Sequence, residues 1–380
     1  MASMYWEDRA RLRQLAYDRK NNLAMAEIDK AYNRATTQLN IDIDTIFSTY
    51  QRKTGLSADE AFKFLDEGIP PDIYQSLLAR AATVADPKQR KQLYTTLRAE
   101  AYKARITRIQ AIQDATYTGM TEAADVELRV MDKLLRDSAD MGYSRMMYDI
   151  QSKTGVGFQM VGVPSRGLDT ILKSKWSGTN YAVRVWQNRD AMAGLLNSAM
   201  LEQVSIGELS AQSMKDLRGM VDTKAWAQKV ADGMKSKFKD ETQYAKYAAN
   251  RLVRTESAYA ANQTTAIAYD ECEIDRYEFL ATLDGRTSPM CQEHDGLINP
   301  GTGGPYITAD KEIGVNWPPL HPFCRSSTAP VLDTQDNSLR TRAAQGRDGK
   351  TVKIPRSMNY QSWKAWQDAG APDLATWRDE

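Results

Sequence analysis

Residues 28–50 read IDKAYNRATTQLNIDIDTIFSTY and decide the fold class of the amino-terminal part of the chain. Apolar or small side chains recur there at steps of three or four residues, and mostly polar residues fill the positions between them. This spacing returns to one face of an α-helix, so it predicts an amphipathic helix that packs one stripe against a partner. The stripe consists of Ile28, Tyr32, Ala35, Leu39, Ile43, Ile46 and Tyr50.

Helical character continues along the chain. A second long helix is predicted to run to about Ile150 and to end at Gly155, because glycine adopts the left-handed conformation that closes a helix. Residues 155–182 are rich in Gly and Ser and weakly periodic, which indicates a boundary. Helical spacing then resumes, and we expect a long helix over residues 240–270.

The pattern changes near residue 277. In residues 277–283, YEFLATL, apolar side chains occupy the odd positions, which predicts a strand, and the turn pair Asp284-Gly285 follows. From about residue 331 the chain is linker-like. Four aromatic side chains then predict a strap anchored on another surface: Tyr360, Trp363, Trp366 and Trp377.

These patterns predict an elongated, mainly α protein. At 380 residues, a prior of about 150 residues per domain suggests two or three domains. The expected parts are a helical arm at 1–154, a linker and helical middle region at 155–239, a small α+β module at 240–330, and an extended tail at 331–380.

Composition excludes several classes of protein. The 50 Lys and Arg residues nearly balance 49 Asp and Glu, so the formal charge is +1 and any nucleic-acid binding must be local. Mean hydropathy is -0.57, and no apolar run approaches the roughly 18 residues that a membrane span requires. The opening MASMYWEDRARLRQL has no apolar core of a signal peptide, so we expect synthesis in the cytoplasm.

Four of the five Cys and His residues fall within 34 positions. They form two pairs with ligands three apart, and a Gly-rich loop lies between the pairs, so together they can supply tetrahedral zinc. Four protein ligands would close the site, which is typical of structural zinc. The predicted ligands are Cys291, His294, His321 and Cys324.

Two other interpretations of this window stay open. In one, a metal-free mini-domain uses the same side chains for packing and hydrogen bonds. In the other, a Cys/His pair acts as nucleophile and base in a hydrolase, although no third orienting group stands out.

Residues 80–108 are the most basic part of the chain, with eight basic and two acidic residues and a local charge of +6. Such a helix can follow a phosphate backbone, which makes a DNA-binding accessory protein the alternative function. A solvated helix face explains the same charges without a ligand. The basic residues are Arg80, Lys88, Arg90, Lys91, Arg98, Lys103, Arg105 and Arg108.

Several motifs of the carboxy-terminal half resemble the phage head morphogenesis family, the Mu F-like minor capsid proteins of tailed bacteriophages. They are RTE at 254–256, YEFLATLDGRTSPMC at 277–291, HDG at 294–296 and GVNWPPLHPFCRSSTAP at 314–330. The opening YWEDR at 5–9 and the tail KIPRSMNYQSWKAW at 353–366 are similar to the ends of the longer minor head proteins.

This resemblance implies a virion component that lies inside the capsid near the portal and is made in the host cytoplasm. The implied partners are the portal protein, the major capsid or scaffolding protein, and phage DNA during packaging or ejection. The resemblance brings no catalytic role, so we expect a protein that is not an enzyme, with structural zinc as its one cofactor.

Carried over position by position, the family motif falls on Arg254, Glu256, Asp284, Arg286, Cys291, Asp295, Gly296, Pro319, His321, Pro322, Cys324 and Arg325. Many members have Cys where Ser288 and Ser326 stand here, and His294 is the expected replacement ligand. Arg254, Glu256 and Arg325 have two interpretations, a salt-bridge network that docks the long helix on the module or a ligand-binding group.

Overall fold

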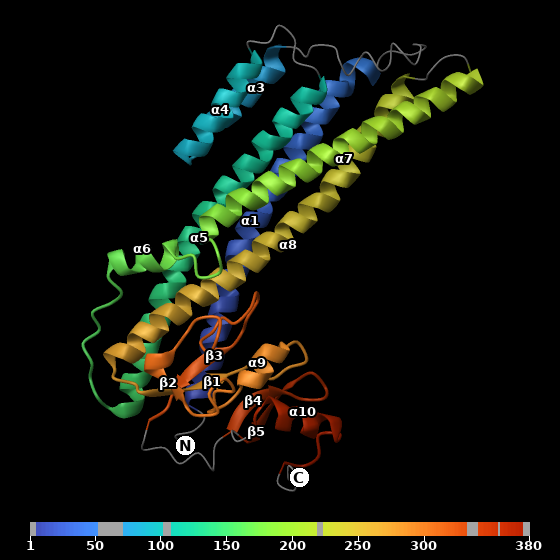
Figure 1. Ribbon diagram of the computed structural model, residues 1–380. Coiled ribbons are helices and arrows are strands. Elements are labelled where there is room, and N and C mark those ends of the chain that lie inside the picture. Colours follow the sequence, from blue (N-terminus) through green and yellow to red (C-terminus); the bar gives the residue numbers. More distant parts are fainter. Residues whose placement is uncertain are drawn as a thin grey trace. The chain divides into compact units, whose positions relative to one another are not determined.

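The computed structural model describes residues 5–51, 71–101, 108–218, 223–332, 341–355 and 358–374 (Figure 1). Its helices are α1 (Tyr5–Gln51), α3 (Pro71–Ala82), α4 (Pro87–Ala101), α5 (Arg108–Thr154), α6 (Ser165–Lys173), α7 (Tyr181–Arg218), α8 (Thr223–Glu271), α9 (Pro289–His294) and α10 (Tyr360–Asp368). Its strands are β1 (Arg276–Leu280), β2 (Tyr306–Ile307), β3 (Ser327–Pro330), β4 (Thr341–Gln345) and β5 (Thr351–Pro355). The predicted mainly α class with a small carboxy-terminal sheet is confirmed.

The amphipathic stripe of α1 is buried as expected. Six of its seven predicted members, from Ile28 to Ile46, belong to the hydrophobic core, while the side chain of Tyr50 lies outside the described residues. The end of α5 is also confirmed, because Gly155 has φ of 70° and its N–H donates to the carbonyl of Gln151.

The chain divides into two compact units, each assembled from distant segments. Unit 1 comprises Met1–Ala24, Asp132–Tyr181 and Arg251–Glu380, and unit 2 comprises Met25–Met131 and Ala182–Asn250. Boundaries between the units therefore fall inside α1, α5 and α8. This division differs from the four consecutive segments expected from the sequence.

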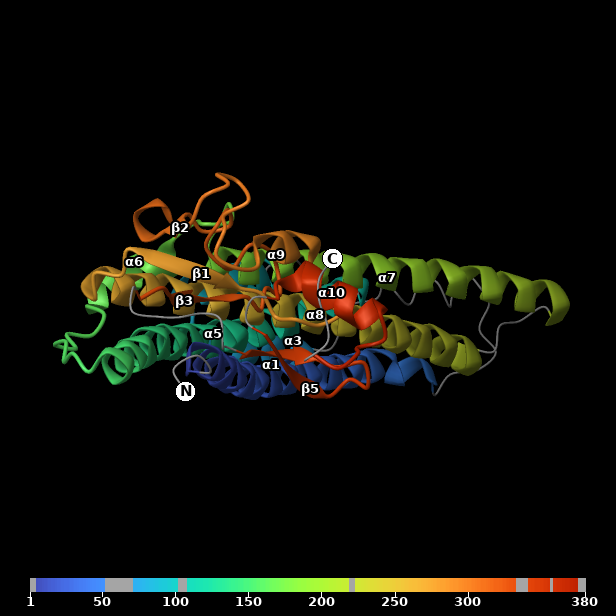
Figure 2. The same cartoon turned by 90° about the horizontal axis from the view of Figure 1, so that it is seen from below.

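Unit 2 is a set of packed helices joined by buried polar contacts. The Tyr32 hydroxyl on α1 donates to Glu127 on α5 at 2.7 Å, and α1 and α5 can be followed side by side in Figure 2. Arg189 on α7 is almost fully buried and donates to Thr121 on α5 and to Gln89 on α4. Such contacts fix the helix register because each buried polar group needs its partner.

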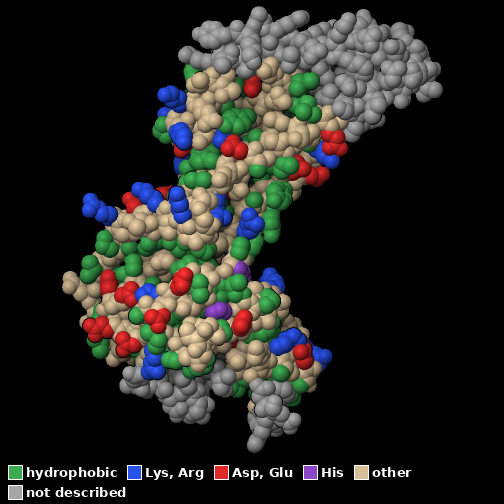
Figure 3. Space-filling view, viewed as in Figure 1, with side chains coloured by type: hydrophobic (Ala, Val, Ile, Leu, Met, Phe, Trp, Pro, Cys, Tyr) green, Lys and Arg blue, Asp and Glu red, His purple; other side chains and the backbone are tan. Residues whose placement is uncertain are grey.

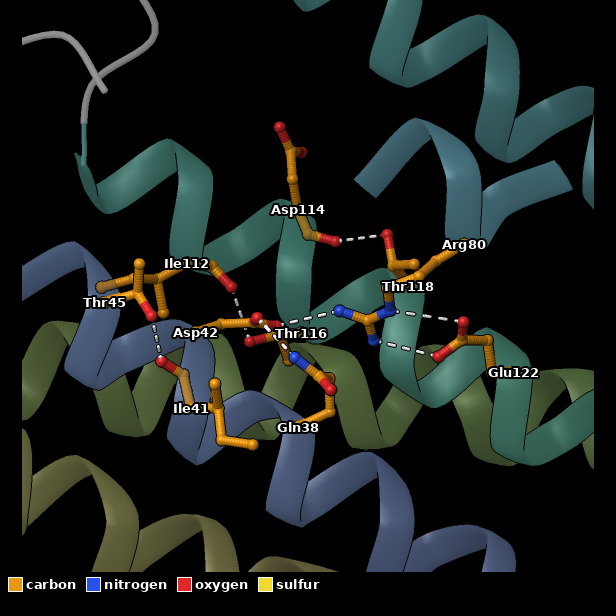
Figure 4. A network of polar contacts seen from close by, with 10 residues as sticks. All are labelled: Gln38, Ile41, Asp42, Thr45, Arg80, Ile112, Asp114, Thr116, Thr118 and Glu122. Atoms are coloured by element: carbon orange, nitrogen blue, oxygen red, sulfur yellow. Dashed lines mark hydrogen bonds and ion pairs between the residues drawn. The ribbon is translucent and has the colours of Figure 1, made fainter. Parts of the chain in front are cut away.

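Arg80 holds three helices of unit 2 together. Its guanidinium on α3 lies between Asp42 on α1 and Glu122 on α5, with N···O distances of 2.9 Å to each (Figure 4). The Arg80 side chain is only 16% exposed. Because this cation is paired and largely desolvated, its removal would leave the carboxylates of Asp42 and Glu122 without their partner.

We expect Arg80→Ala to lower the free energy of unfolding of unit 2 by about 2 kcal/mol, since it breaks a partly buried ion-pair network. Lys88→Ala is the matched control, because Lys88 is an exposed cation on the neighbouring helix and should change stability by less than about 0.5 kcal/mol. Urea unfolding of both variants measures the difference. Equal, small effects would contradict the role given to Arg80.

Glu127 makes the stability of unit 2 depend on pH. Burial raises its pKa from 4.5 to about 7, against the opposing effect of the hydrogen bond from Tyr32. Because the folded state holds this proton more tightly than the unfolded state, the contribution to stability is complete below about pH 4.5 and is lost as pH rises through 7. The shift corresponds to roughly 3 kcal/mol.

Relative to Glu127→Gln, the wild-type protein should therefore lose about 3 kcal/mol of unfolding free energy between pH 4.5 and 8. Subtracting the unfolding free energies of the two proteins removes the contribution of the other titratable groups, which both proteins share. Denaturant unfolding across this pH range measures it, and a difference independent of pH would show that Glu127 does not titrate as proposed.

Unit 1 is built around a close crossing of α5 and α8. Thr264 on α8 donates to the carbonyl of Ala139 at 2.7 Å, and a Cβ placed on Gly142 would lie 2.6 Å from the Thr264 hydroxyl and 2.9 Å from Ala261 Cα. Only glycine allows this approach. The amino-terminal part of α1 joins the crossing through an ion pair from Arg13 to Asp149, which is buried on α5.

A three-stranded antiparallel sheet of order β2-β1-β3 packs on this crossing. The predicted strand is confirmed as β1, although it ends at Leu280. In Figure 1 the sheet and α9 lie beside the carboxy-terminal part of α8. Trp317 donates to the carbonyl of Asn262 at 3.1 Å, and Thr328 donates to the hydroxyl of Tyr269 at 3.2 Å.

The tail corrects the expected extended strap. Strands β4 and β5 form an antiparallel hairpin, and α10 packs Tyr360, Trp363 and Trp366 against it and Leu283. The aromatic residues are thus anchors as predicted, but within a small core of their own. Trp377 lies outside the described residues.

Among the helices of the described residues, none is long and apolar enough to cross a membrane.

Candidate metal centre

Two segments supply the candidate ligands of this centre, and they are called its two arms. The first arm is the short helix α9. Ser288 caps it by accepting the N–H of Cys291 at 3.3 Å, and Pro289 occupies its first position, where proline is favoured. This geometry turns Cys291 inward, where it is only 2% exposed.

The second arm is the tight turn from His321 to Cys324. The N–H of Cys324 donates to the carbonyl of His321 at 3.2 Å, and Phe323 has φ of 60°. Pro322 followed by a residue with positive φ is the pattern of a type II turn. The turn is held on α8 because the N–H of Phe323 donates to the Thr255 hydroxyl at 3.1 Å.

Three side chains meet between these arms. Cys291 Sγ lies 3.2 Å from His321 Nε2 and 3.7 Å from Cys324 Sγ, and the three ligand atoms all lie within 4.8 Å of one another. Two sulfurs on one tetrahedral zinc, each about 2.3 Å from the ion, are about 3.8 Å apart. The observed separation fits this geometry and is far too long for a disulfide, whose S–S length is about 2.05 Å. Cys291, His321 and Cys324 can therefore hold a metal ion.

The imidazole of His321 is oriented for metal binding. Its Nδ1 lies 2.7 Å from the carbonyl oxygen of Pro322, and because a carbonyl only accepts, Nδ1 carries the hydrogen. In the neutral ring this leaves the lone pair of Nε2 directed at the sulfurs. Histidine atoms reach the surface in Figure 3, in agreement with the partial exposure of both histidines.

The two thiols have unequal acidities. The hydrogen bond from Cys291 lowers the pKa of Cys324 well below its usual value, although burial opposes the shift, and hydrogen bonds from His321 and from the backbone of Leu320 and Ser326 add to it. The hydrogen bond to Cys324 and burial raise the pKa of Cys291. One thiolate next to an imidazole favours a positive charge between the arms, whether a proton or a metal ion.

His294 does not join this group, which corrects the predicted set of four ligands to three. Its Nδ1 lies 3.0 Å from the Tyr306 hydroxyl, which itself donates to the His294 carbonyl at 2.7 Å. The ring also lies 5.6 Å from that of Phe279. Burial lowers the pKa of His294, so the imidazole is a neutral partner of β1 and β2.

Asp284 and Arg325, two of the motif residues, form a bidentate ion pair with distances of 2.5 and 2.7 Å. Burial opposes ionisation of Asp284, but hydrogen bonds from Arg325 and from the N–H of Arg286 outweigh it and lower the pKa of Asp284. The Arg286 side chain is exposed. The ion pair fastens the turn after β1 to the metal-binding turn.

Asp295 and Gly296 secure the end of α9. The Asp295 carboxylate accepts the N–H of Ala281 at 2.8 Å. Gly296 has φ of 118° and exchanges two backbone hydrogen bonds of 2.9 Å with Phe279. Pro319 follows a cis peptide bond in the chain leading to the turn.

The two motif residues on α8 bind different partners. Arg254 donates to Asp18 at 3.0 Å and to Asn22 at 2.7 Å, both on α1. Glu256 is buried and accepts the indole N–H of Trp176 at 3.1 Å.

Two further residues of the site, Thr255 and Trp176, were not predicted. Thr255 stands at the centre of the RTE motif, so the motif itself was a signal for its role in holding the metal-binding turn. No pattern in the sequence linked Trp176, whose ring stacks on Tyr259 at 4.8 Å, to Glu256.

The basic segment is only partly available for phosphate. Arg80 is bound to two carboxylates, and Arg90 donates to the carbonyl of Val84 at 2.9 Å, whereas Lys88 and Lys91 are exposed. Lys103 and Arg105, and the side chains of Arg98 and Arg108, lie outside the described residues.

These features define a helical protein with a small α+β module that carries a group of three side chains able to hold a metal ion. Residues 189–329 match the family described as Phage Mu protein F like protein, which confirms the resemblance found in the sequence. Searches of curated proteins and of solved structures gave no match.

Proposed function

We propose that the protein is a minor capsid protein of a tailed bacteriophage that associates with the portal vertex, inside the head. In this role it supports procapsid assembly and the packaging or ejection of DNA. The family match over residues 189–329 carries the proposal, because this segment contains α8, the sheet and the complete Cys/His/Cys group.

The role is one of interaction rather than catalysis. Support comes from the way the motif side chains are used: Asp284 and Arg325 bind each other, Thr255 holds the turn, and Arg254 binds α1. These contacts stabilise a module and hold it on a long helix. Its partners are the portal protein and, within the head, the major capsid or scaffolding protein and the packaged DNA.

The metal of the centre is Zn²⁺ in this proposal. Two cysteines and one histidine are ligands that zinc prefers, and the sulfur separation of 3.7 Å fits tetrahedral coordination. Cys291, His321 and Cys324 would hold the ion, which supplies a cross-link between α9 and the turn 321–324. An ion held by ligands from both segments would act as a staple between them.

The basic-helix alternative has weaker support. A DNA-binding role for residues 80–108 needs several free cations on one surface, and Arg80 and Arg90 already make contacts within unit 2.

Co-sedimentation with purified portal rings tests the proposed partner. The full chain should sediment with the rings at a small fixed ratio that resists moderate salt. Sedimentation with double-stranded DNA alone, weakening steeply with salt, would favour the DNA-binding alternative. Binding to neither would overturn the proposed portal association.

A further inference from the structure

The metal centre supplies three ligands where tetrahedral zinc takes four. In the part of the chain that the structure describes, the cluster contains Cys291, His321 and Cys324 and no fourth Cys, His, Asp or Glu. The fourth ligand predicted from the sequence, His294, is turned to Tyr306. A zinc ion with three protein ligands keeps one position for water or another external ligand.

A small cavity lies directly beside the cluster. Its volume is about 20 Å³, and its lining includes Cys291 and His321 together with the side chains of Ser288, Ser326 and Arg286. A cavity needs roughly 10–15 Å³ of such volume to hold one water molecule, so this one takes a single small ligand.

The lining of the cavity is polar and positive. The Ser288 hydroxyl accepts the N–H of Cys291 at 3.3 Å, and Ser288 and Ser326 line the cavity together with Cys291. Arg325 lines the same cavity, but the ion pair with Asp284 balances its charge, so the positive charge comes from Arg286, which also lines the cavity and is exposed. Guanidinium groups near a metal favour a water-derived hydroxide or a small anion over a neutral ligand.

The residues around this cavity leave it open to solvent. His321 is partly exposed, Pro322 is exposed, and Ser288 is partly exposed at the start of α9. A ligand in the cavity can therefore exchange with solvent without unfolding of the module.

Resting on the proposed zinc binding, we infer that the centre is an open site. Cys291, His321 and Cys324 would hold Zn²⁺, and the adjoining cavity would admit water or a small monovalent anion as the fourth ligand. The structure thus assigns to this module a ligand-binding position in addition to a staple. Binding an anion there forms one metal–ligand bond and releases the bound water.

Cobalt substitution of the full-length chain under reducing conditions tests this inference, with Co²⁺ as the spectroscopic stand-in for zinc. Wild-type protein should show thiolate-to-cobalt charge transfer and tetrahedral d–d bands. Addition of thiocyanate or azide should shift the d–d bands and leave the charge transfer in place. If cobalt gives no thiolate bands at all, the zinc proposal fails and this inference fails with it.

Serine variants separate the open site from a closed one. Ser288→Cys places a second thiol three residues before Cys291, a spacing typical of zinc ligands. It should add thiolate intensity, abolish the anion shift and raise zinc affinity by more than about 10-fold, since even outer-shell partners are worth about 10–100-fold. Ser326→Cys is the second variant, in case loss of the Ser288 cap affects folding. The inference requires at least one of the two to behave in this way.

Met290→Cys is the matched control, because it adds a thiol at an exposed position of α9 outside the lining of the cavity, and it should retain both cobalt affinity and the anion shift. A wild-type spectrum with thiolate bands that no anion changes would overturn the open site while leaving zinc binding intact.

Discussion

Gly142→Ala is expected to destabilise unit 1 by about 3 kcal/mol, because the added methyl group has no space at the crossing of α5 and α8. The built Cβ lies 2.9 Å from Ala261 Cα and 2.6 Å from the Thr264 hydroxyl, and closer still to the Ala261 carbonyl oxygen. Backbone atoms of α8 cannot rotate away as a side chain can. The helices must therefore separate, which also weakens the bond from Thr264 to Ala139.

Thermal unfolding measures this effect as a decrease in Tm of about 10 °C for a unit of this size. Gly194→Ala is the matched control, because Gly194 lies in α7 with nothing within 4 Å of its built Cβ. That variant should gain about 0.5–1 kcal/mol from helix propensity. If the two variants have the same stability, the close crossing is not as described.

Loss of either metal-binding cysteine should have an effect of similar size. Zinc at about a thousand times its Kd stabilises the folded state by about 4 kcal/mol. Cys291→Ala, Cys324→Ala or His321→Ala should remove bound zinc and most of this stabilisation, and a chelator should lower the Tm of the wild-type protein to match. Metal analysis of the purified chain should give one zinc per wild-type molecule and none in these variants.

The chain provides matched controls for both residue types. Cys272 is buried beside Met147, with 3.4 Å between the sulfurs, and His294 is bound to Tyr306. Cys272→Ala and His294→Ala should keep one zinc each, although each loses some packing. Zinc retained in Cys291→Ala but lost in His294→Ala would contradict the ligand set. A Tm that is unchanged by chelator in the wild-type protein would remove the staple.

The helices could be predicted because their buried faces and their ends appear in the sequence as patterns of nearby residues. The stripe from Ile28 to Ile46, the glycine that ends α5 at Gly155 and the Ser288 cap of α9 each depend on residues within a few positions of one another. Burial and backbone conformation at these places follow from spacing alone.

The ligand set was only partly predictable, since it depends on a residue distant in sequence. Cys291 and His294 are three apart and both belong to α9, but Tyr306 on β2 binds the imidazole and directs it away from the sulfurs. No local pattern places Tyr306 there. Contacts between distant residues also explain why the β4–β5 hairpin and its core around Leu283 were not predicted. They likewise explain why the division into two units that share α1, α5 and α8 was not predicted.

The copy number of this chain relative to portal subunits, measured by quantitative mass spectrometry of purified DNA-free procapsids and mature virions, tests the central proposal most directly. A portal-associated minor capsid protein predicts a small fixed ratio in both particles. Absence from both would contradict the proposed function.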